Sequence, residues 1–174
     1  MNQIAYFKFF IFSLLLLAFP LEAKLLKPSQ DGEKKEILII NGKRRLYYPV
    51  QAEGIHYSVN GPTRLEFISR YPVLKKKNKS NPYSYRIIVD DQDTIIVNHK
   101  YKVQKSIKSV QHPKHKYTYS GNYFINLSSG KHKVVILPEK KLKYPVLMRV
   151  LSKEFGSVTK EKKILQPMVH QNSL

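Results

Sequence analysis

The sequence contains no cysteine. Disulfide bonds, thiol nucleophiles and thiolate metal ligands are therefore excluded, and so is acylation of a lipoprotein cysteine. No disulfide bond can therefore contribute to the stability of the fold. A domain of about 150 residues buries roughly 68–70% of its unfolded surface, so it needs no covalent cross-links.

Two motifs typical of hydrolases are also absent, namely the Gly-x-Ser-x-Gly nucleophile elbow and the His-Glu-x-x-His zinc motif. The serines fall in predicted turns, and no spacing marks a pair of catalytic carboxylates. We therefore expect a protein that is not an enzyme and that carries no cofactor. A hydrolase without a recognisable motif is one alternative.

Acidic residues are scarce, with 12 Asp and Glu against 31 Lys and Arg, which gives a formal net charge of +19. Most of the basic residues are lysines, whose flexible, strongly hydrated charges suit a diffuse anionic partner better than planar, bidentate recognition. The expected partner is an anionic envelope polymer, a membrane surface or an acidic protein. The alternative is that lysine enrichment reflects solubility and coding bias.

The only long apolar run lies at the N-terminus, from Phe9 to Phe19, and is interrupted by Ser13 alone. Lys8 precedes it, Pro20 follows it, and Ala23 supplies a small residue, which together indicate a secretory signal peptide cleaved after Ala23. The run is shorter than the roughly 20 residues that span a bilayer, so no transmembrane span is expected after cleavage. We expect a secreted or periplasmic protein of the cell envelope, which argues against a nucleic-acid partner.

Composition divides the chain into four expected segments. Residues 1–23 form the signal peptide and residues 24–35 a flexible lead-in. Residues 36–152 carry the strand-like pattern of one domain. Residues 153–174 form a C-terminal extension that we expect to be partly disordered.

The stretch from Asn60 to Arg70 shows the pattern most clearly. Asn60-Gly61-Pro62 predicts a turn, and the following residues alternate, with Leu65 and Phe67 on one face of a half-buried strand. The opposite face carries Arg64, Glu66 and Arg70, which we interpret as a cross-strand charge ladder.

Similar strands and turns recur along the chain. Asn41-Gly42 predicts a type I′ hairpin turn, and Asp90-Asp91-Gln92-Asp93 predicts another turn. Tyr83, Tyr85, Ile87 and Val89 alternate with Ser84 and Arg86 and predict another strand. No segment after residue 23 has an apolar period of 3.6. About ten short strands result, so we predict an all-β fold, a single antiparallel β-sandwich of immunoglobulin-like or jelly-roll type.

Two stretches carry a resemblance to known proteins. Ser129-Gly130-Lys131-His132-Lys133-Val134-Val135-Ile136 and the strand from Gly61-Pro62 to Arg70 resemble PEGA-type and related immunoglobulin-like β-sandwich modules of bacterial envelope proteins. The resemblance covers about a quarter of the chain. It implies a non-enzymatic surface or periplasmic module and names no ligand.

Basic residues gather in patches along the sequence. The candidate residues for binding an anionic ligand are Lys75, Lys76, Lys77, Lys79, Lys100, Lys102 and Lys105. Basic residues interleaved with aromatics also bind glycans by stacking, so a carbohydrate-binding module is a second alternative. Against this, Tyr117 and Tyr119 share one face across Thr118, and we expect both in the core.

Metal sites are not expected. His112 and His115 have a spacing that a metal could use, but lysines flank them and no acidic residue is near in the sequence, so we expect a solvated loop. His132 is interpreted as a structural residue held by a hydrogen bond. The acidic turn at residues 90–93 lacks the glycine and later glutamate of a calcium-binding hand, so turn formation explains it.

Overall fold

The computed structural model of the chain describes residues 23–29, 34–74 and 80–154. These residues form twelve strands: β1 (Lys24–Leu25), β2 (Glu36–Ile40), β3 (Lys43–Pro49), β4 (Ile55–Arg70), β5 (Pro72–Val73), β6 (Asn81–Val89), β7 (Asp93–Tyr101), β8 (Val103–Gln104), β9 (Lys108–Ser109), β10 (Lys116–Thr118), β11 (Gly121–Pro138) and β12 (Leu147–Glu154). Every pairing between them is antiparallel. The prediction of an antiparallel all-β sandwich is therefore confirmed. Within the described ranges, no helix is long and apolar enough to cross a bilayer.

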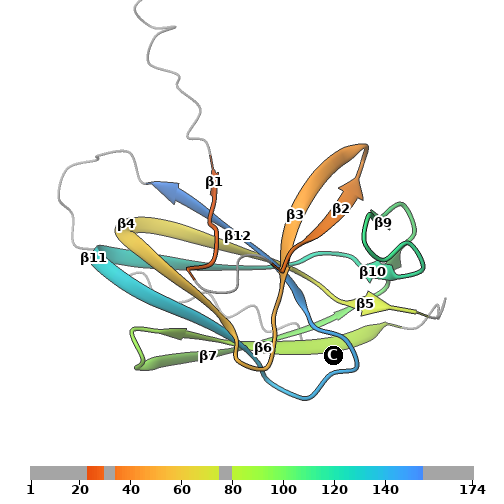
Figure 1. The fold of residues 1–174 in the computed structure, drawn as a ribbon. Helices are drawn as coiled ribbons and strands as arrows, with labels where there is room; N and C mark the ends of the chain where they lie inside the picture. The colour runs from red at the N-terminus through yellow and green to blue at the C-terminus, as the bar shows by residue number, and fades with distance from the viewer. Residues whose placement is uncertain (1–22, 30–33, 75–79, 155–174) are drawn as a thin grey trace, which may run out of the picture.

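Two long strands organise the sandwich. β4 and β11 pair along almost their whole length, from Ile55 opposite Ile136 to Ser69 opposite Gly121. Both strands bend sharply, so each contributes one limb to each layer (Figure 1). The sheet order is β7-β6-β11-β4-β12-β3-β2-β9, with β6 beside the C-terminal limb of β11 and β12 beside the C-terminal limb of β4.

The bend replaces an expected turn. Asn60-Gly61-Pro62 does not reverse the chain as predicted, because β4 continues through it and stays paired with β11. The partner strand shifts its register between Leu127 and Gly130, which is a β-bulge of the kind that bends a strand at the corner of a sandwich. Two pairs of expected short strands are therefore two long ones.

The main core lies between the two layers. Leu65 and Phe67 are both fully buried, which confirms the face predicted from their alternation. Every second residue of β6, from Tyr83 to Val89, also enters this core, as the sequence pattern predicts. Of the residues between them, Arg86 and Ile88 are partly exposed, whereas Ser84 is also buried.

A second, smaller core lies under the β2–β3 hairpin. It is formed by Leu38, Tyr47, Ile107, Tyr117 and Leu147. A short sheet of order β5-β10-β8 lies beside it. The hairpin turn at Asn41-Gly42 has positive φ at both residues, 50° and 74°, as the predicted type I′ turn requires.

The ends of the described chain differ from expectation. Lys24 and Leu25 of the expected lead-in form β1, which pairs with Ser152 and Leu151 of β12. Ser29 donates a backbone hydrogen bond of 2.7 Å to the carbonyl of His56. β12 runs to Glu154, two residues beyond the expected domain boundary.

Candidate functional site

The predicted anion-binding lysines divide into two groups. Lys75, Lys76, Lys77 and Lys79 lie outside the described residues. Lys100, Lys102 and Lys105 are exposed, at the end of β7, just after it, and in the turn that follows β8. Together with the exposed Lys108 of β9, we call these three residues the β7–β9 lysine group.

No member of the β7–β9 lysine group forms an ion pair with a residue that the structure describes. The acidic side chains, by contrast, are mostly engaged. Five of them are contacted by basic partners: Glu36 by His112, Glu66 by Lys153, Asp90 by His132, Asp91 by Lys133 and Glu139 by Arg86. The positive charge of the β7–β9 lysine group is therefore not compensated by these carboxylates.

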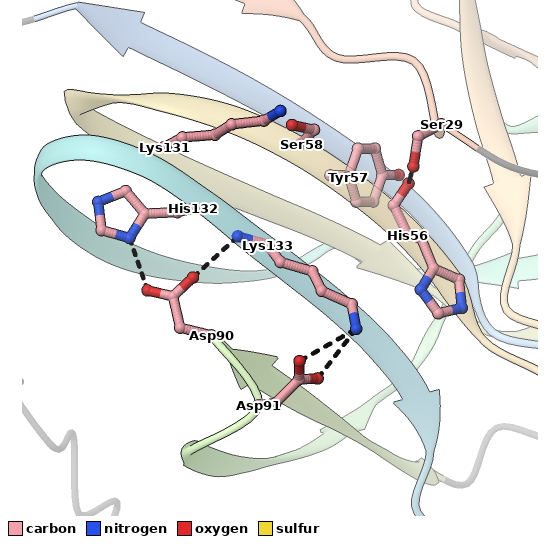
Figure 2. A pocket seen from close by; sticks show the side chains of 9 residues that line it. All are labelled: Ser29, His56, Tyr57, Ser58, Asp90, Asp91, Lys131, His132 and Lys133. Carbon is pink, nitrogen blue, oxygen red and sulfur yellow. Dashed lines mark hydrogen bonds and ion pairs between the residues drawn. The ribbon is translucent and has the colours of Figure 1, made fainter.

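An open pocket of about 560 Å³ lies beside the bend of β11. Its lining comes from the β6–β7 turn, both long strands and the segment after β1: Ser29, His56, Tyr57, Ser58, Asp90, Asp91, Lys131, His132 and Lys133. Figure 2 shows that the two aspartates turn toward the basic side chains of β11 and not into free space. Both carboxylates of the pocket are therefore already paired with His132 and Lys133.

Asp90 links the β6–β7 turn to β11 just after the β11 bulge. One carboxylate oxygen lies 2.7 Å from Nδ1 of His132, and the other accepts a 2.9 Å bond from the backbone N–H of Lys133. Asp90 itself adopts φ of +53°, a conformation that aspartate tolerates better than most residues. The hydrogen bond predicted for His132 is therefore present.

Ser128, His132 and Asp90 superficially form a serine-hydrolase arrangement, since Nε2 of His132 is 3.5 Å from the Ser128 hydroxyl oxygen. The same Nε2 lies only 3.0 Å from the carbonyl oxygen of Ser128, which accepts but never donates. Nε2 must therefore carry a proton in this geometry. An imidazole in that state has no lone pair with which to activate the hydroxyl, so the arrangement does not act as a triad.

The two charged partners shift each other's protonation. The hydrogen bond from His132, with that from the Lys133 backbone, lowers the pKa of Asp90 below 3.8. The hydrogen bond to Asp90 raises the pKa of His132 above 6.5, against the opposing effect of burial. Both groups are therefore held in their charged forms.

A second polar cluster lies at the smaller core. Glu36, at the start of β2, is buried. Its Oε1 atom lies 3.3 Å from Nδ1 of His112. Ser109 and Tyr117 both donate hydrogen bonds to this oxygen, the former at 2.7 Å. The loop at 112–115 is thus not simply solvated, and the acidic neighbour that the sequence does not place near it comes from a distant strand.

The prediction that Tyr117 and Tyr119 both lie in the core is correct for Tyr117 only. Tyr117 is fully buried, but the side chain of Tyr119 is 51% exposed. β10 ends at Thr118, so the alternation that places both rings on one face does not extend to Tyr119. Tyr119 instead donates its backbone N–H to the carbonyl of Lys102, within the region of the β7–β9 lysine group.

The outer face of the β4–β11 pair carries a mixed polar and aromatic surface. Phe124 is exposed, and the guanidinium of Arg64 lies 4.4 Å from the centre of its ring. Asn126 stands opposite Arg64 in the register, and Asn122 donates a 3.3 Å hydrogen bond to Glu66.

Arg70 does not belong to the charge ladder that we expected on this face. Its side chain is buried, and its guanidinium donates hydrogen bonds to Tyr47, Gln104 and Thr118.

Comparisons with known proteins place the chain in no family. No family model matches it, and the curated proteins yield no match. Among solved structures, an exo-β-1,3-galactanase from Phanerochaete chrysosporium bound to galactose matches with 10% identity and a TM-score of 0.34. A family GH115 4-O-methyl-α-glucuronidase with specificity for decorated arabinogalactans matches with 10% identity and a TM-score of 0.38.

These matches involve parts of much longer chains. The galactanase match covers 75% of this chain and 26% of the other, and the glucuronidase match covers 78% and 16%. Likeness at this level shows neither a shared family nor a shared activity. The resemblance to PEGA-type modules stays a prediction.

Proposed function

We propose that this chain is an exported, non-catalytic β-sandwich module that binds an anionic envelope component or an acidic partner through lysine-rich surface. The observation that carries the proposal is the distribution of charge. Five described carboxylates already contact basic side chains, whereas Lys100, Lys102 and Lys105 contact none and are exposed. These lysines are available to an anion from outside.

The placement of these lysines fits an extended ligand better than a small one. They lie along the end of one strand and the short segments that follow it, and not around the pocket. Exposed lysines on flexible stems make weak individual contacts, so affinity must come from several charges acting together. Polyanions such as acidic glycans, or a membrane rich in anionic lipid, supply many charges at once.

Co-sedimentation of the chain from Lys24 to Leu174 tests the proposal. The probes are vesicles of anionic lipid, vesicles of zwitterionic lipid and purified cell-wall polymer, each at low and at moderate salt. Selective binding to an anionic probe that weakens as salt rises is expected, because the Debye length falls from about 30 Å at 0.01 M to about 8 Å at 0.15 M ionic strength. Absence of binding to every probe would remove the charge argument.

A matched pair of variants locates the surface. Lys100→Glu, Lys102→Glu and Lys105→Glu together should abolish binding. The control replaces the exposed lysines Lys140, Lys141 and Lys143 by glutamate, which changes the net charge equally on another loop. An equal loss in the two triple variants would show that net charge, and not this surface, drives the association.

The outer face of β4 and β11 favours a second candidate, a carbohydrate-binding module. An exposed aromatic ring flanked by asparagine and charged side chains offers stacking and hydrogen bonding to a sugar. Binding of a neutral polysaccharide that barely responds to salt and is lost in Phe124→Ala would favour this candidate. Retention in Phe124→Ala would exclude this face.

A further inference from the structure

We propose that Glu36, His112 and His115 form a binding site for a dication of the zinc type, which links the start of β2 to the loop between β9 and β10. Each residue offers one ligand atom, and the three atoms lie within 4.8 Å of one another. Two imidazole nitrogens and one carboxylate oxygen form a ligand set that zinc accepts, with a fourth position left for water.

The identity of the ligands selects the class of ion. Calcium and magnesium prefer shells made of oxygen, and this cluster supplies a single carboxylate. Imidazole nitrogen suits zinc, nickel and copper, all of which bind such ligands more readily than magnesium does. Zinc is therefore an appropriate probe, with magnesium as the contrasting ion.

An unsatisfied atom provides an independent reason. Nδ1 of His115 is buried and has no hydrogen-bond partner among the residues that the structure describes. Buried polar atoms in proteins are nearly always satisfied, so an orphaned imidazole nitrogen calls for an explanation.

The surroundings hold the ligands in place. The hydrogen bonds from Ser109 and Tyr117 orient the carboxylate of Glu36, as outer-shell partners orient metal ligands elsewhere. The turn that carries both histidines is closed by a 3.0 Å bond from the N–H of His115 to the carbonyl of His112. The site is thus largely formed before any ion arrives.

Access and charge decide how an ion enters. The side chain of His112 is 54% exposed and that of Glu36 only 9%, so an ion approaches from the His112 side. Lys114 and Lys116 flank His115 in the sequence and repel cations. The carboxylate of Glu36 offsets part of this repulsion. Glu36 is far from the loop in the sequence, so only the fold brings this negative charge beside the histidines.

The test is a zinc titration of the untagged full chain by isothermal calorimetry, with thermal unfolding followed in parallel. One saturable site is expected, together with a rise in Tm on adding zinc that magnesium does not reproduce. His112→Ala and His115→Ala should each lower the zinc affinity at least about tenfold, since even outer-shell changes cost that much. His56→Ala, in the separate pocket, should leave the affinity unchanged.

His112 is the more informative ligand to remove, because its exposed side chain contributes little to packing. Circular dichroism of His112→Ala without metal confirms that the fold is retained. The proposal is overturned if no saturable binding occurs, or if both histidine variants bind zinc as the unaltered chain does. It is equally overturned if His56→Ala weakens binding as much as they do, since scattered surface histidines would then account for the uptake.

Discussion

Gly61 lies so close to Ser128 that a Cβ on Gly61 would sit 1.7 Å from the Ser128 carbonyl oxygen. The obstructing atom belongs to the backbone of the partner strand, so it cannot swing away. The contact falls where β4 and β11 bend together, between the two layers. Glycine is therefore required at this position by space and not by its φ angle.

Gly61→Ala should destabilise the protein by about 3 kcal/mol, because overpacking against backbone forces the strands apart. Urea unfolding measures the change. The control is Gly42→Ala, where nothing lies within 4 Å and only the φ of +74° is unfavourable, which costs about 1 kcal/mol for a residue with a Cβ. Equal losses in the two variants would show that the bend can relax.

Tyr117→Phe should lower the free energy of unfolding by about 2 kcal/mol, since it removes a buried hydrogen bond to a carboxylate. Tyr119→Phe is the matched control two residues away, where the side chain is exposed and no hydrogen bond from its hydroxyl is found to described residues. Chemical denaturation of both variants measures the two changes in the free energy of unfolding. A similar small effect in each would mean that Ser109 alone satisfies Glu36.

The stability should depend on pH through His99, whose ring packs among Tyr83, Tyr85 and Tyr101. Burial lowers its pKa to about 4. Between pH 6.5 and about 4 the unfolded chain therefore binds a proton that the folded chain does not, so the free energy of unfolding falls as the pH falls through that range. In His99→Phe this dependence should be reduced. An unchanged slope would refute the assignment.

The Asp90–His132 pair should stabilise the protein only within a window of pH. Its contribution is lost below the lowered pKa of Asp90, when the carboxylate protonates, and above the raised pKa of His132, when the imidazole becomes neutral. Asp90→Asn retains a residue that tolerates positive φ, so it isolates the charge. Asp93→Asn in the same turn is the control, and NMR titration of His132 should show its pKa reduced only in Asp90→Asn.

Local signals in the sequence predicted the local structure well. Asn41-Gly42 gave the hairpin turn because positive φ at two consecutive residues has few other solutions. The alternation from Tyr83 to Val89 gave a correct buried face because strand geometry has a period of two. Both depend only on residues that are neighbours in the chain.

What the sequence did not predict depends on distant partners. Asn60-Gly61-Pro62 has the composition of a turn, and only its pairing with the β11 bulge keeps it inside a strand. Glu36 reaches the histidine turn because β2 pairs with β9, a contact that no local pattern announces. The alternation of Tyr117 and Tyr119 is typical of a strand, but it could not show that β10 ends at Thr118, between them.

Because β4 and β11 each run through both layers, neither layer can come apart without breaking the other. Melting one limb of the pair removes the hydrogen bonds that set the register of the second limb. Hydrogen exchange should therefore report similar protection at Phe67 and at Val134, on opposite sides of the bend, and a single cooperative transition should cover both. We therefore expect no partly unfolded state in which one layer is intact and the other is lost.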